Sequence, residues 1–487
     1  MRRTSAVVWI IAAALVLGTS GCMLGPDYVR PETPAYGTQA YFNSPAGWVD
    51  PNNPEAIGRW WQGFDDEVIN SLVDKALLGN YDLKAAAARV AESEAILGQV
   101  RGARLPEVFY AGDRTRSKNT IFFLGEPFTT YTTVYSQGFS INYIADLFGR
   151  LRRNEQAAFA ELLASANSQQ ALVHGIVAQV VRTRVTAATQ QELLDIANAN
   201  IRSREQTVEI VERRYNQGLV PALDVYLARE NLAAIRSEEP VIRRALAQAR
   251  HSLNVLIGQI PGAPTLLPDT LPDTPSLGPV PVGVPAALLD RRPDVRAAEN
   301  QLTAATQRVG ASIAALFPDL TLSASWGTTS DTFRGLGFLD GEVYSAIIAL
   351  AAPVFQGGRL RAGVDAAWAR TEQAAANYAQ VVLGAMREVE DALVDQQTTA
   401  ERVKILEVRL VEAARAEALA LERYQRGLEQ ILIVLDTERR RIQAESALAI
   451  AKGNLYEARI NLYLALGGDW RIEAEAAAIV NGEDEKI

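Results

Sequence analysis

The sequence predicts a mainly α-helical chain in two similar halves, each of which also carries two amphipathic β-strands able to join a transmembrane β-barrel. Three observations predict this fold class: a motif that occurs twice, helical patterns of unusual length, and short segments with strand periodicity. The 487 residues are 48% hydrophobic but only 7% aromatic. This composition is more typical of long packed helices than of an aromatic-rich globular core.

The two halves are visible in a repeated motif. Residues 214–230 read RYNQGLVPALDVYLARE, and residues 423–438 read RYQRGLEQILIVLDTE. In each copy a long helical pattern runs into a glycine, Gly218 or Gly427, and a second helical pattern leaves it. We therefore predict that each half contains two helices joined by a turn at this glycine.

The first residues are typical of a bacterial export signal. Two arginines precede a short apolar run, which is too short to span a bilayer, and small residues follow up to Cys22. Residues 1–21 are therefore expected to be a signal peptide. The Gly–Cys ending resembles the lipoprotein box of bacteria, although Thr19 replaces its aliphatic residue, and implies acylation of Cys22. Met23 then implies sorting to the outer membrane; an ordinary signal followed by a buried cysteine is the alternative.

The first half begins with an arm over residues 22–63, which is rich in Pro, Gly and Asn and is expected to be extended. The first repeat, residues 64–258, should open with two helices, over 64–79 and 82–104. Large and small residues then alternate with a period of two, which is typical of strands with one apolar and one polar face. The predicted strands cover about residues 106–117 and 131–145, with a loop over 117–130.

A long helix follows these strands. The helical pattern runs without proline from Arg150 to Gly218, which corresponds to about 68 residues, or roughly 100 Å of helix. Pro221 begins the return helix, because the first turn of a helix tolerates proline. That helix should end near Gly258, and Pro240 inside it is expected to cause a kink.

The second half repeats this order after a Pro-rich linker over residues 259–285. The second repeat covers residues 286–467 and is followed by a tail over 468–487. Its strands are predicted at about residues 318–329 and 342–353, and its long helix should end at Gly427. The facing of the last strand is ambiguous from its sequence.

The second long helix carries a seven-residue apolar repeat, which predicts left-handed supercoiling against a neighbouring helix. Gln396, Thr399 and Glu417 interrupt the apolar character, so we expect a looser and wetter contact there. The full seam is Tyr378, Val382, Ala385, Val389, Ala392, Gln396, Thr399, Val403, Leu406, Leu410, Ala413, Glu417, Ala420 and Tyr424.

The predicted strands cannot close a membrane barrel within one chain. Each is about 10 residues long, the length of a tilted strand that crosses a bilayer. An open sheet in lipid leaves the backbone groups at its edges unpaired, and a closed barrel needs at least about eight strands. Several copies must therefore contribute strands, and the helices would continue the barrel as a hollow coiled-coil tube.

Several motifs follow one another along the chain: CMLGPDYVRP at 22–31, DLFGR at 146–150, LLDRRPDVRAAE at 288–299, APVFQGGRL at 352–360, LYLALGGDW at 462–470 and the two RYxxGL turns. Together and in this order they make the chain resemble the TolC-like outer-membrane factors of tripartite RND-type efflux pumps, and within them the NodT subgroup of lipoproteins. The resemblance implies a homotrimer with a barrel of about twelve strands and an α-helical periplasmic tunnel. It also implies a bacterial outer-membrane protein that contacts outer-membrane lipid, a periplasmic adaptor (membrane fusion protein) and an inner-membrane transporter.

The resemblance further implies a gate at the periplasmic end of the tunnel. Tyr424 would donate a hydrogen bond to the ionised Asp224 as a latch, and Asp436 would form a ring that narrows the pore. Leu432, one turn from Asp436, would add an apolar constriction. On the residues alone, Asp224 can equally favour its helix dipole, Asp436 can be a solvated residue, and Tyr424 can be core packing.

The arginine of this gate has two candidates. In one branch of the family an arginine follows the second turn glycine by two positions, but this chain has Glu429 there. Arg423 or Arg426 would then supply the guanidinium group. The residues implied to contact the adaptor lie at the two turns: Gly218, Leu219, Gly427 and Leu428.

Composition argues against most other functions. A net charge of −9 offers no basic patch for nucleic acid, and two histidines and one cysteine leave little with which to build a metal or thiol site. We therefore expect no cofactor and no enzymatic activity. The leading interpretation is a passive efflux duct for small molecules whose identity the sequence does not specify. A type I protein-secretion duct and a structural coiled-coil lipoprotein that spans the periplasm are the alternatives.

Overall fold

The computed structural model describes residues 23–32, 59–124, 126–264, 288–337 and 341–467. The predicted signal peptide, Cys22, most of the arm, most of the linker and the tail lie outside these residues. The chain divides into two compact units, each made of three segments. One unit holds all the described strands together with residues 23–31, and the other holds the two helical turns.

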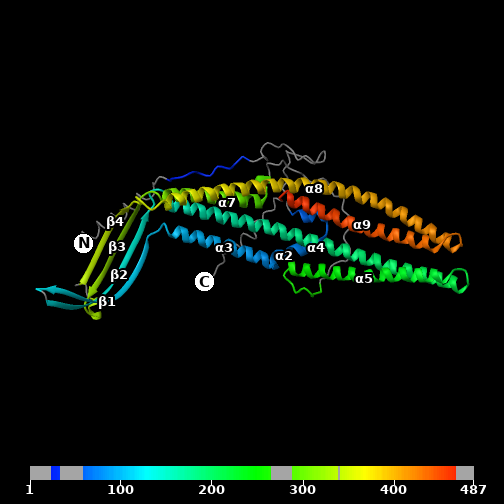
Figure 1. Ribbon diagram of the computed structural model, residues 1–487, viewed down its shortest axis with the longest axis horizontal. Helices are drawn as coiled ribbons and strands as arrows, with labels where there is room; N and C mark the ends of the chain where they lie inside the picture. Colours follow the sequence, from blue (N-terminus) through cyan, green and yellow to red (C-terminus); the bar gives the residue numbers. More distant parts are fainter. Residues whose placement is uncertain (1–22, 33–58, 125, 265–287, 338–340, 468–487) are drawn as a thin grey trace. The chain divides into compact units, whose positions relative to one another are not determined.

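The four strands form one antiparallel sheet in the order β1-β2-β3-β4 (Figure 1). Its outer strands, β1 and β4, each pair on one side only within the described chain. The strands are β1 (Glu107–Phe123), β2 (Glu126–Ala145), β3 (Asp319–Ser330) and β4 (Glu342–Ala351).

Strands β1 and β2 are longer than the sequence predicts. They pair continuously from Glu107 opposite Asn142 to Phe123 opposite Glu126, so most of residues 117–130 form strand and the loop expected there is wrong. Strand β3 pairs with β2 only over 135–145, which leaves the outer part of β1 and β2 as a two-stranded ribbon. Threonine and aromatic residues favour strands, and they hold this ribbon despite the polar residues around position 118.

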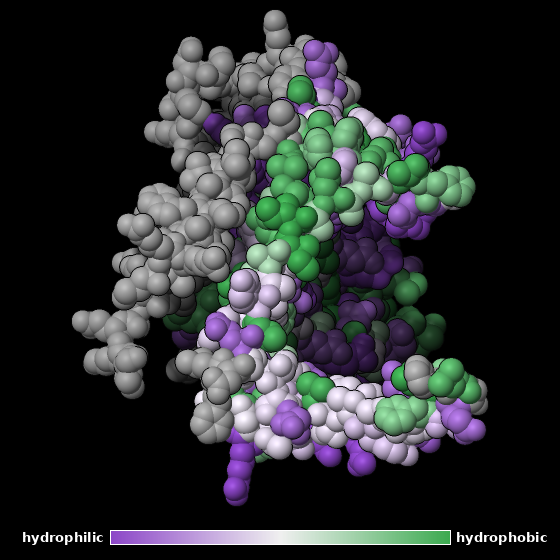
Figure 2. Space-filling model, turned by 90° about the vertical axis from the view of Figure 1, so that its left-hand side faces the viewer, coloured by the Kyte–Doolittle hydropathy of each residue, from purple (hydrophilic) through white to green (hydrophobic). Residues whose placement is uncertain are grey.

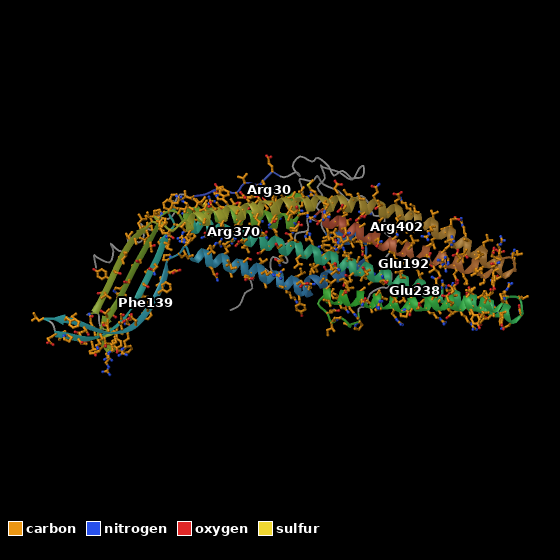
Figure 3. All side chains as sticks on the ribbon, viewed as in Figure 1. Arg30, Phe139, Glu192, Glu238, Arg370 and Arg402 are labelled. Carbon is orange, nitrogen blue, oxygen red and sulfur yellow. The ribbon has the colours of Figure 1, made fainter. Side chains whose placement is uncertain are left out.

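The sheet exposes many large hydrophobic side chains in the single chain. Figure 2 shows hydrophobic side chains gathered in a band over the strands. Phe139, labelled on β2 in Figure 3, is an example. Its side chain is half exposed, and its ring centroid lies 5.1 Å from that of Tyr110 on β1. Contiguous apolar surface of this kind marks an interaction with lipid or protein. On β4 the exposed hydrophobic residues are Val343, Tyr344, Ile347, Ile348 and Leu350, on both faces of the strand.

Two helical hairpins make up most of the second unit (Figure 1). The first joins α4 (Arg150–Asn216) to α5 (Ala222–Leu256), and the second joins α8 (Arg359–Gln425) to α9 (Ile431–Ala465). The long helices have 67 residues each and the returning helices 35 each, so the predicted repeat is confirmed. Among the described residues, no helix combines the length and the apolar character needed to cross a bilayer.

The remaining helices are shorter and repeat in the same way. Each half has a helix of 22 residues before its first strand, namely α3 (Tyr81–Gly102) and α7 (Pro293–Ala314). The chain also contains η3 (Trp60–Phe64), α2 (Glu67–Gly79), α6 (Leu288–Arg291) and η5 (Phe333–Gly337).

The heptad seam of α8 is buried as predicted along most of its length. Tyr378, Val389 and Tyr424 are almost fully buried, and the polar Gln396 is buried with them. The Gln396 Oε1 atom accepts no hydrogen bond from any described residue. The looser and wetter contact expected at this position stays a prediction.

The carbonyl of the last residue of each returning helix accepts a hydrogen bond from a polar side chain near the start of the same repeat. The Asn80 amide donates to the Leu256 carbonyl at 2.9 Å, and the Arg292 guanidinium donates to the Ala465 carbonyl at 3.0 Å. These carbonyls belong to the last turn of α5 and of α9, where no further helical N–H is available. The two halves therefore close their hairpins with the same device.

Candidate functional site

The two hairpin turns have the same backbone structure. In the first turn the Gly218 N–H donates to the Tyr215 carbonyl at 2.8 Å and the Leu219 N–H to the Arg214 carbonyl at 2.9 Å. Gly218 has φ +71°, the left-handed conformation that lets glycine end a helix in this way. The second turn has the same two bonds between equivalent residues, Gly427 to Tyr424 and Leu428 to Arg423, each at 2.9 Å.

The hairpins pack against each other just behind these turns. One hydrophobic cluster draws residues from all four long and returning helices, so the two turns are held as a pair within one chain. Leu219 and Leu428, at the apices, are exposed. The cluster consists of Val211, Val225, Ala228, Ala420, Tyr424, Ile431, Val434 and Leu435.

Arg214 joins the first hairpin to the second. Its Nη1 atom donates to the carbonyls of Tyr424 at 2.7 Å and Gln425 at 3.0 Å, in the last turn of α8. Its guanidinium carbon lies 4.8 Å from the centroid of the Tyr424 ring. A cation is favoured both at a helix C-terminus and over an aromatic face. Arg214 is therefore the guanidinium that links the two turns inside this chain.

Tyr424 and Asp224 lie near each other, but their hydroxyl and carboxylate are not bonded. The Tyr424 hydroxyl is buried and has no hydrogen-bond partner among the described residues. Burial raises the pKa of Tyr424, and the charge of Asp224 raises it further against the opposing charge of Arg214. Asp224 occupies the first turn of α5. The hydrogen bond of the latch that the resemblance implies is therefore not formed in this single chain.

Asp436 is paired along its own helix. It accepts from Arg439 and, at 2.6 Å, from Arg440. The bond from Arg439 contributes most, and that from Arg440 next, to lowering the pKa of the Asp436 carboxyl. Asp436 therefore carries a full negative charge near neutral pH. Leu432, one turn earlier on α9, is exposed.

The two arginines proposed for the gate make ion pairs within their own hairpin. Arg423 Nε lies 3.8 Å from Glu429 Oε2, and Arg426 Nη2 lies 2.5 Å from Glu422 Oε1. The sequence did not lead us to predict Arg214, which links the two hairpins, as a residue of this site. The sequence signal that could have found it is the repeat itself, since Arg214 is the first residue of the first RYxxGL copy.

A buried ionic cluster begins at Glu438, two residues after Asp436 on α9, and extends away from the turns. Glu438 on α9 is 2% exposed, and its Oε2 atom lies 3.8 Å from Arg204 Nε of α4. Arg441 pairs with Glu417 of α8 and donates to the Asn200 amide oxygen at 2.5 Å. Burial raises the pKa of Glu438 to about 7, because it outweighs the attraction of Arg204. Of the residues in this ionic cluster, the sequence analysis noted only Glu417, as a polar residue that interrupts the apolar seam of α8.

Within the described residues, the structure has no group of three or more His, Cys, Asp or Glu side chains that could hold a metal ion. The polar groups near the turns are instead arranged as ion pairs and helix caps. Such contacts can hold two hairpins together or release them.

Comparison with known proteins agrees with this architecture. The family model for outer membrane efflux proteins matches residues 72–259 and 284–468. The chain is 32% identical over 470 residues to the toluene efflux pump outer membrane protein TtgF of Pseudomonas putida, covering 94% of this chain and 96% of the relative. It is 30% identical to the cation efflux system protein CusC of Escherichia coli O6:H1, covering 95% and 99%. The solved structure of the outer-membrane channel OprN is similar with a TM-score of 0.86 at 31% identity, covering 92% and 100%.

Proposed function

Because this chain belongs to the outer membrane efflux protein family, we propose that it is the outer-membrane channel of a tripartite efflux system and passively exports small molecules. In this proposal a periplasmic adaptor and an inner-membrane transporter deliver the cargo. The chain has no energy source of its own and is not an enzyme, so opening is driven by partners that bind the open state more tightly. The observation that carries the proposal is a sheet whose outer strands each pair on one side only, among the described residues, in the same chain as two helices of 67 residues.

The free edges of the sheet support a homotrimer. Among the residues that the structure describes, β1 and β4 each pair on one side only, and lipid does not tolerate unpaired backbone groups. Pairing β4 of one copy with β1 of the next satisfies both edges. Three copies give a barrel of about twelve strands, within the range of closed membrane barrels, and the exposed hydrophobic side chains on the strands would face lipid.

The described N-terminal segment supports a lipid anchor at Cys22. The Leu24 N–H donates to the Phe148 carbonyl at 3.2 Å, just beyond the end of β2, and Arg153 donates to the Leu24 carbonyl at 3.0 Å. Farther along, Arg30 forms two bonds of 2.7 Å to Glu299 of α7 (Figure 3). Leu24 thus lies beside the end of a strand, and in this proposal an acyl chain on Cys22, two residues earlier in the sequence, enters the outer-membrane lipid.

The turns support a gate and a docking surface. In this proposal Tyr424 and Asp224 form a latch in the closed trimer, Asp436 lines the narrowest part of the pore, and Leu432 adds an apolar constriction. The exposed apices contact the adaptor through Gly218, Leu219, Gly427 and Leu428. The proposal does not specify which small molecule is exported, because the relatives carry names as different as toluene efflux pump and cation efflux system.

Planar-bilayer recording tests the proposal. The purified full-length protein should insert and give discrete conductance steps. Tyr424→Phe combined with Asp224→Ala should leave the oligomer intact and raise the single-channel conductance, because the latch is lost. An intact oligomer that gives no conductance steps would contradict the proposal that the protein is a channel. Unchanged conductance in the double variant would show that Tyr424 and Asp224 do not form a latch.

A further inference from the structure

One face of the sheet carries a row of aromatic side chains that crosses all four strands. Residues that pair directly across neighbouring strands point to the same face, and in this row each aromatic residue pairs with the next. Between the row and the strand ends that join helices, the same face is apolar. The row is Tyr110 on β1, Phe139 on β2, Trp326 on β3 and Tyr344 on β4, and the apolar residues are Val108, Ile141, Leu322, Ile348 and Leu350.

The opposite face of the sheet is polar, which makes the aromatic face the lipid face in the proposed channel. Tyrosine and tryptophan collect where membrane strands leave the hydrocarbon, so the apolar band of a barrel ends in an aromatic girdle. The row lies toward the β1–β2 and β3–β4 connections, and it therefore marks the outer border of the membrane. The polar face carries Ser136, Ser140, Asn142, Ser323, Ser325 and Ser345.

Beyond the aromatic row, the lipid face of β1 becomes basic. Arg114, Arg116 and Lys118 follow Tyr110 at even spacings, so their side chains share its face. They lie opposite residues 131–135 of β2, and all three are exposed. No other lysine or arginine occurs in the four strands of the described chain. The positive charge of the sheet is thus concentrated at one place.

Two tyrosines of β2 lie beside these cations. The Arg114 guanidinium carbon is 5.6 Å from the centroid of the Tyr135 ring, and that of Arg116 is 5.9 Å from the Tyr131 ring. Lys118 Nζ is 5.7 Å from the same Tyr131 ring. A ring attracts a cation but supplies no acceptor oxygen. None of the three cations forms an ion pair with a carboxylate among the described residues, so their N–H donors are available to an anion.

The acids near these cations are turned away or occupied. Asp113 is at an odd position of β1 and accepts from the hydroxyls of Ser136 and Thr115 on the polar face. Glu342 of β4 is on the lipid face, but its carboxylate accepts from the Trp326 indole at 2.6 Å. The lipid face of β1 therefore carries three positive charges that no described acid of the same strand balances.

The spacing of the cations indicates the kind of anion. At roughly 3.4 Å per residue, Arg114 lies about 13 Å and Lys118 about 27 Å beyond Tyr110 along the strand, or roughly 9 to 19 Å above it at a tilt of about 45°. The headgroup layer on each side of an ordinary bilayer is only about 5 to 8 Å thick. A lipid whose headgroup is a phosphorylated saccharide carries anionic groups over a thicker layer and matches these heights.

We propose that Arg114, Arg116 and Lys118, with Tyr131 and Tyr135 behind them, bind phosphate groups of a glycolipid in the outer leaflet of the membrane. The arginine fork suits two oxygens of one phosphate, and lysine adds a point charge. This inference rests on the proposed outer-membrane channel and adds a lipid-binding site to it. The bound glycolipid holds the β1–β2 ribbon at the membrane surface.

Native mass spectrometry of the full-length protein in detergent tests the site, with lipid A, a diphosphorylated glycolipid, as the added probe. The wild type should retain lipid A as added mass. Arg114→Gln combined with Arg116→Gln and Lys118→Gln should weaken this binding on the order of 100-fold, because each cation near an anionic lipid surface contributes severalfold. Binding of lipid A by this triple variant at wild-type strength would overturn the proposal.

A matched control removes the same charges elsewhere. Arg402, Lys404 and Arg409 are exposed on α8, and replacing all three with glutamine should leave lipid A binding unchanged. Equal loss of binding in this control would show that overall charge matters and would overturn the site on β1.

Two further probes distinguish the sources of phosphate. Phosphatidylglycerol carries its phosphate at one height, and inorganic pyrophosphate has no acyl chains, so both should bind on the order of tenfold more weakly than lipid A. Equal binding of phosphatidylglycerol would show a site for ordinary phospholipid, and equal binding of pyrophosphate would show a site for free anions. Either result would overturn the glycolipid.

Tyrosine variants test the site without changing its charge. Tyr131→Leu should weaken lipid A binding about threefold, because Arg116 and Lys118 lose the ring, whereas Tyr131→Phe should not. Equal binding in Tyr131→Leu and Tyr131→Phe would contradict the role of the ring. Conductance steps from a variant that no longer binds lipid A would separate this site from the channel, whose own failure is an intact oligomer without steps.

Discussion

Glu438 lies on α9 among charged groups from the packed helices around it. Arg204 reaches it from α4, Glu417 lies on α8, and Arg441 is on α9 itself. Glu230 and Glu238 of α5 act on Arg204 from the other side. Desolvation dominates at this carboxyl and raises its pKa from 4.5 to about 7. The folded chain therefore holds a proton at Glu438 more tightly than the unfolded chain does.

This shift predicts how stability depends on pH. Between the unfolded pKa of 4.5 and the folded pKa of about 7, the folded state keeps a proton that the unfolded state has lost. Stability should therefore fall as pH rises through this window, with a slope of at most about 1.4 kcal/mol per pH unit. Glu438→Gln should remove this part of the slope in thermal unfolding of the detergent-solubilised protein.

The control is Glu445→Gln, which removes another carboxylate that pairs with Arg441 in the same cluster. It should keep the pH dependence that Glu438 causes. An equal slope in wild type and in Glu438→Gln would show that Glu438 is not protonated in the folded chain.

Arg292 predicts a second effect at the residue scale. Its guanidinium is mostly buried, donates to Ala465 at the end of α9, and pairs with Asp294 and Glu388 at 2.7 Å each. Arg292→Ala should lower the free energy of unfolding by about 2 kcal/mol, because the buried guanidinium and its bond to the Ala465 carbonyl are lost, whereas the two carboxylates are 42% and 49% exposed and stay solvated.

Arg292→Lys tests whether geometry or charge matters at this site. Lysine keeps the charge but lacks the fork that reaches a carbonyl and two carboxylates together, so it should recover less than half of the loss. Full recovery with lysine would show that charge alone suffices and that the cap on α9 is unimportant. Chemical denaturation followed by circular dichroism gives both values.

Residues that act within one hairpin could be predicted from the sequence, whereas those that act between hairpins could not. The turn glycines follow from a local rule, because only glycine adopts their positive φ readily. The repeat marks Arg214 as the first residue of an RYxxGL copy, but its partners Tyr424 and Gln425 are distant in sequence, and no periodicity shows that contact. Glu438 was missed for the same reason, since its burial depends on three other helices.

At the element scale, the long helices were predictable and the outer strands were not. The absence of proline and a sustained helical period place α4 and α8 within a few residues of their observed ends. Strand prediction failed over residues 117–130, because the charged and polar side chains there interrupt the alternation. Cross-strand partners such as Thr120 and Thr129, whose hydroxyls bond at 3.0 Å, hold the ribbon together instead.

The ribbon should be dispensable for assembly. Ser117 pairs with Thr132, and β3 begins to pair with β2 only at Tyr135. Replacing residues 118–131 with an Asn-Gly turn should therefore leave the four-stranded part of the sheet intact, because this dipeptide suits a two-residue hairpin. Heat-resistant migration on a gel and single-channel conductance should both match the wild type.

A shorter replacement provides the comparison for this experiment. Removing only residues 121–128, with Thr120 and Thr129 joined by the same turn, should behave like the longer replacement. Loss of the heat-resistant oligomer in either variant would show that the ribbon takes part in contacts between copies.

At the scale of the whole molecule, two surfaces of the single chain stay open. Among the described residues, β1 and β4 each pair on one side only, and the first hairpin exposes Tyr215 and Tyr226, whereas the second hairpin buries Tyr424 and Leu435. In the proposed oligomer, β4 of one copy pairs with β1 of the next. The sequence predicted the open sheet edges from the number of strands and the chemistry of lipid, whereas the exposed tyrosines are visible only in the burial of individual residues.

The central claim, that copies of this chain complete one another's sheet, is tested most directly by native mass spectrometry of the full-length protein extracted in detergent. The account predicts a single species with the mass of three copies. A protein that stays monomeric at every concentration, and that also keeps the folded β1–β4 sheet, would contradict it.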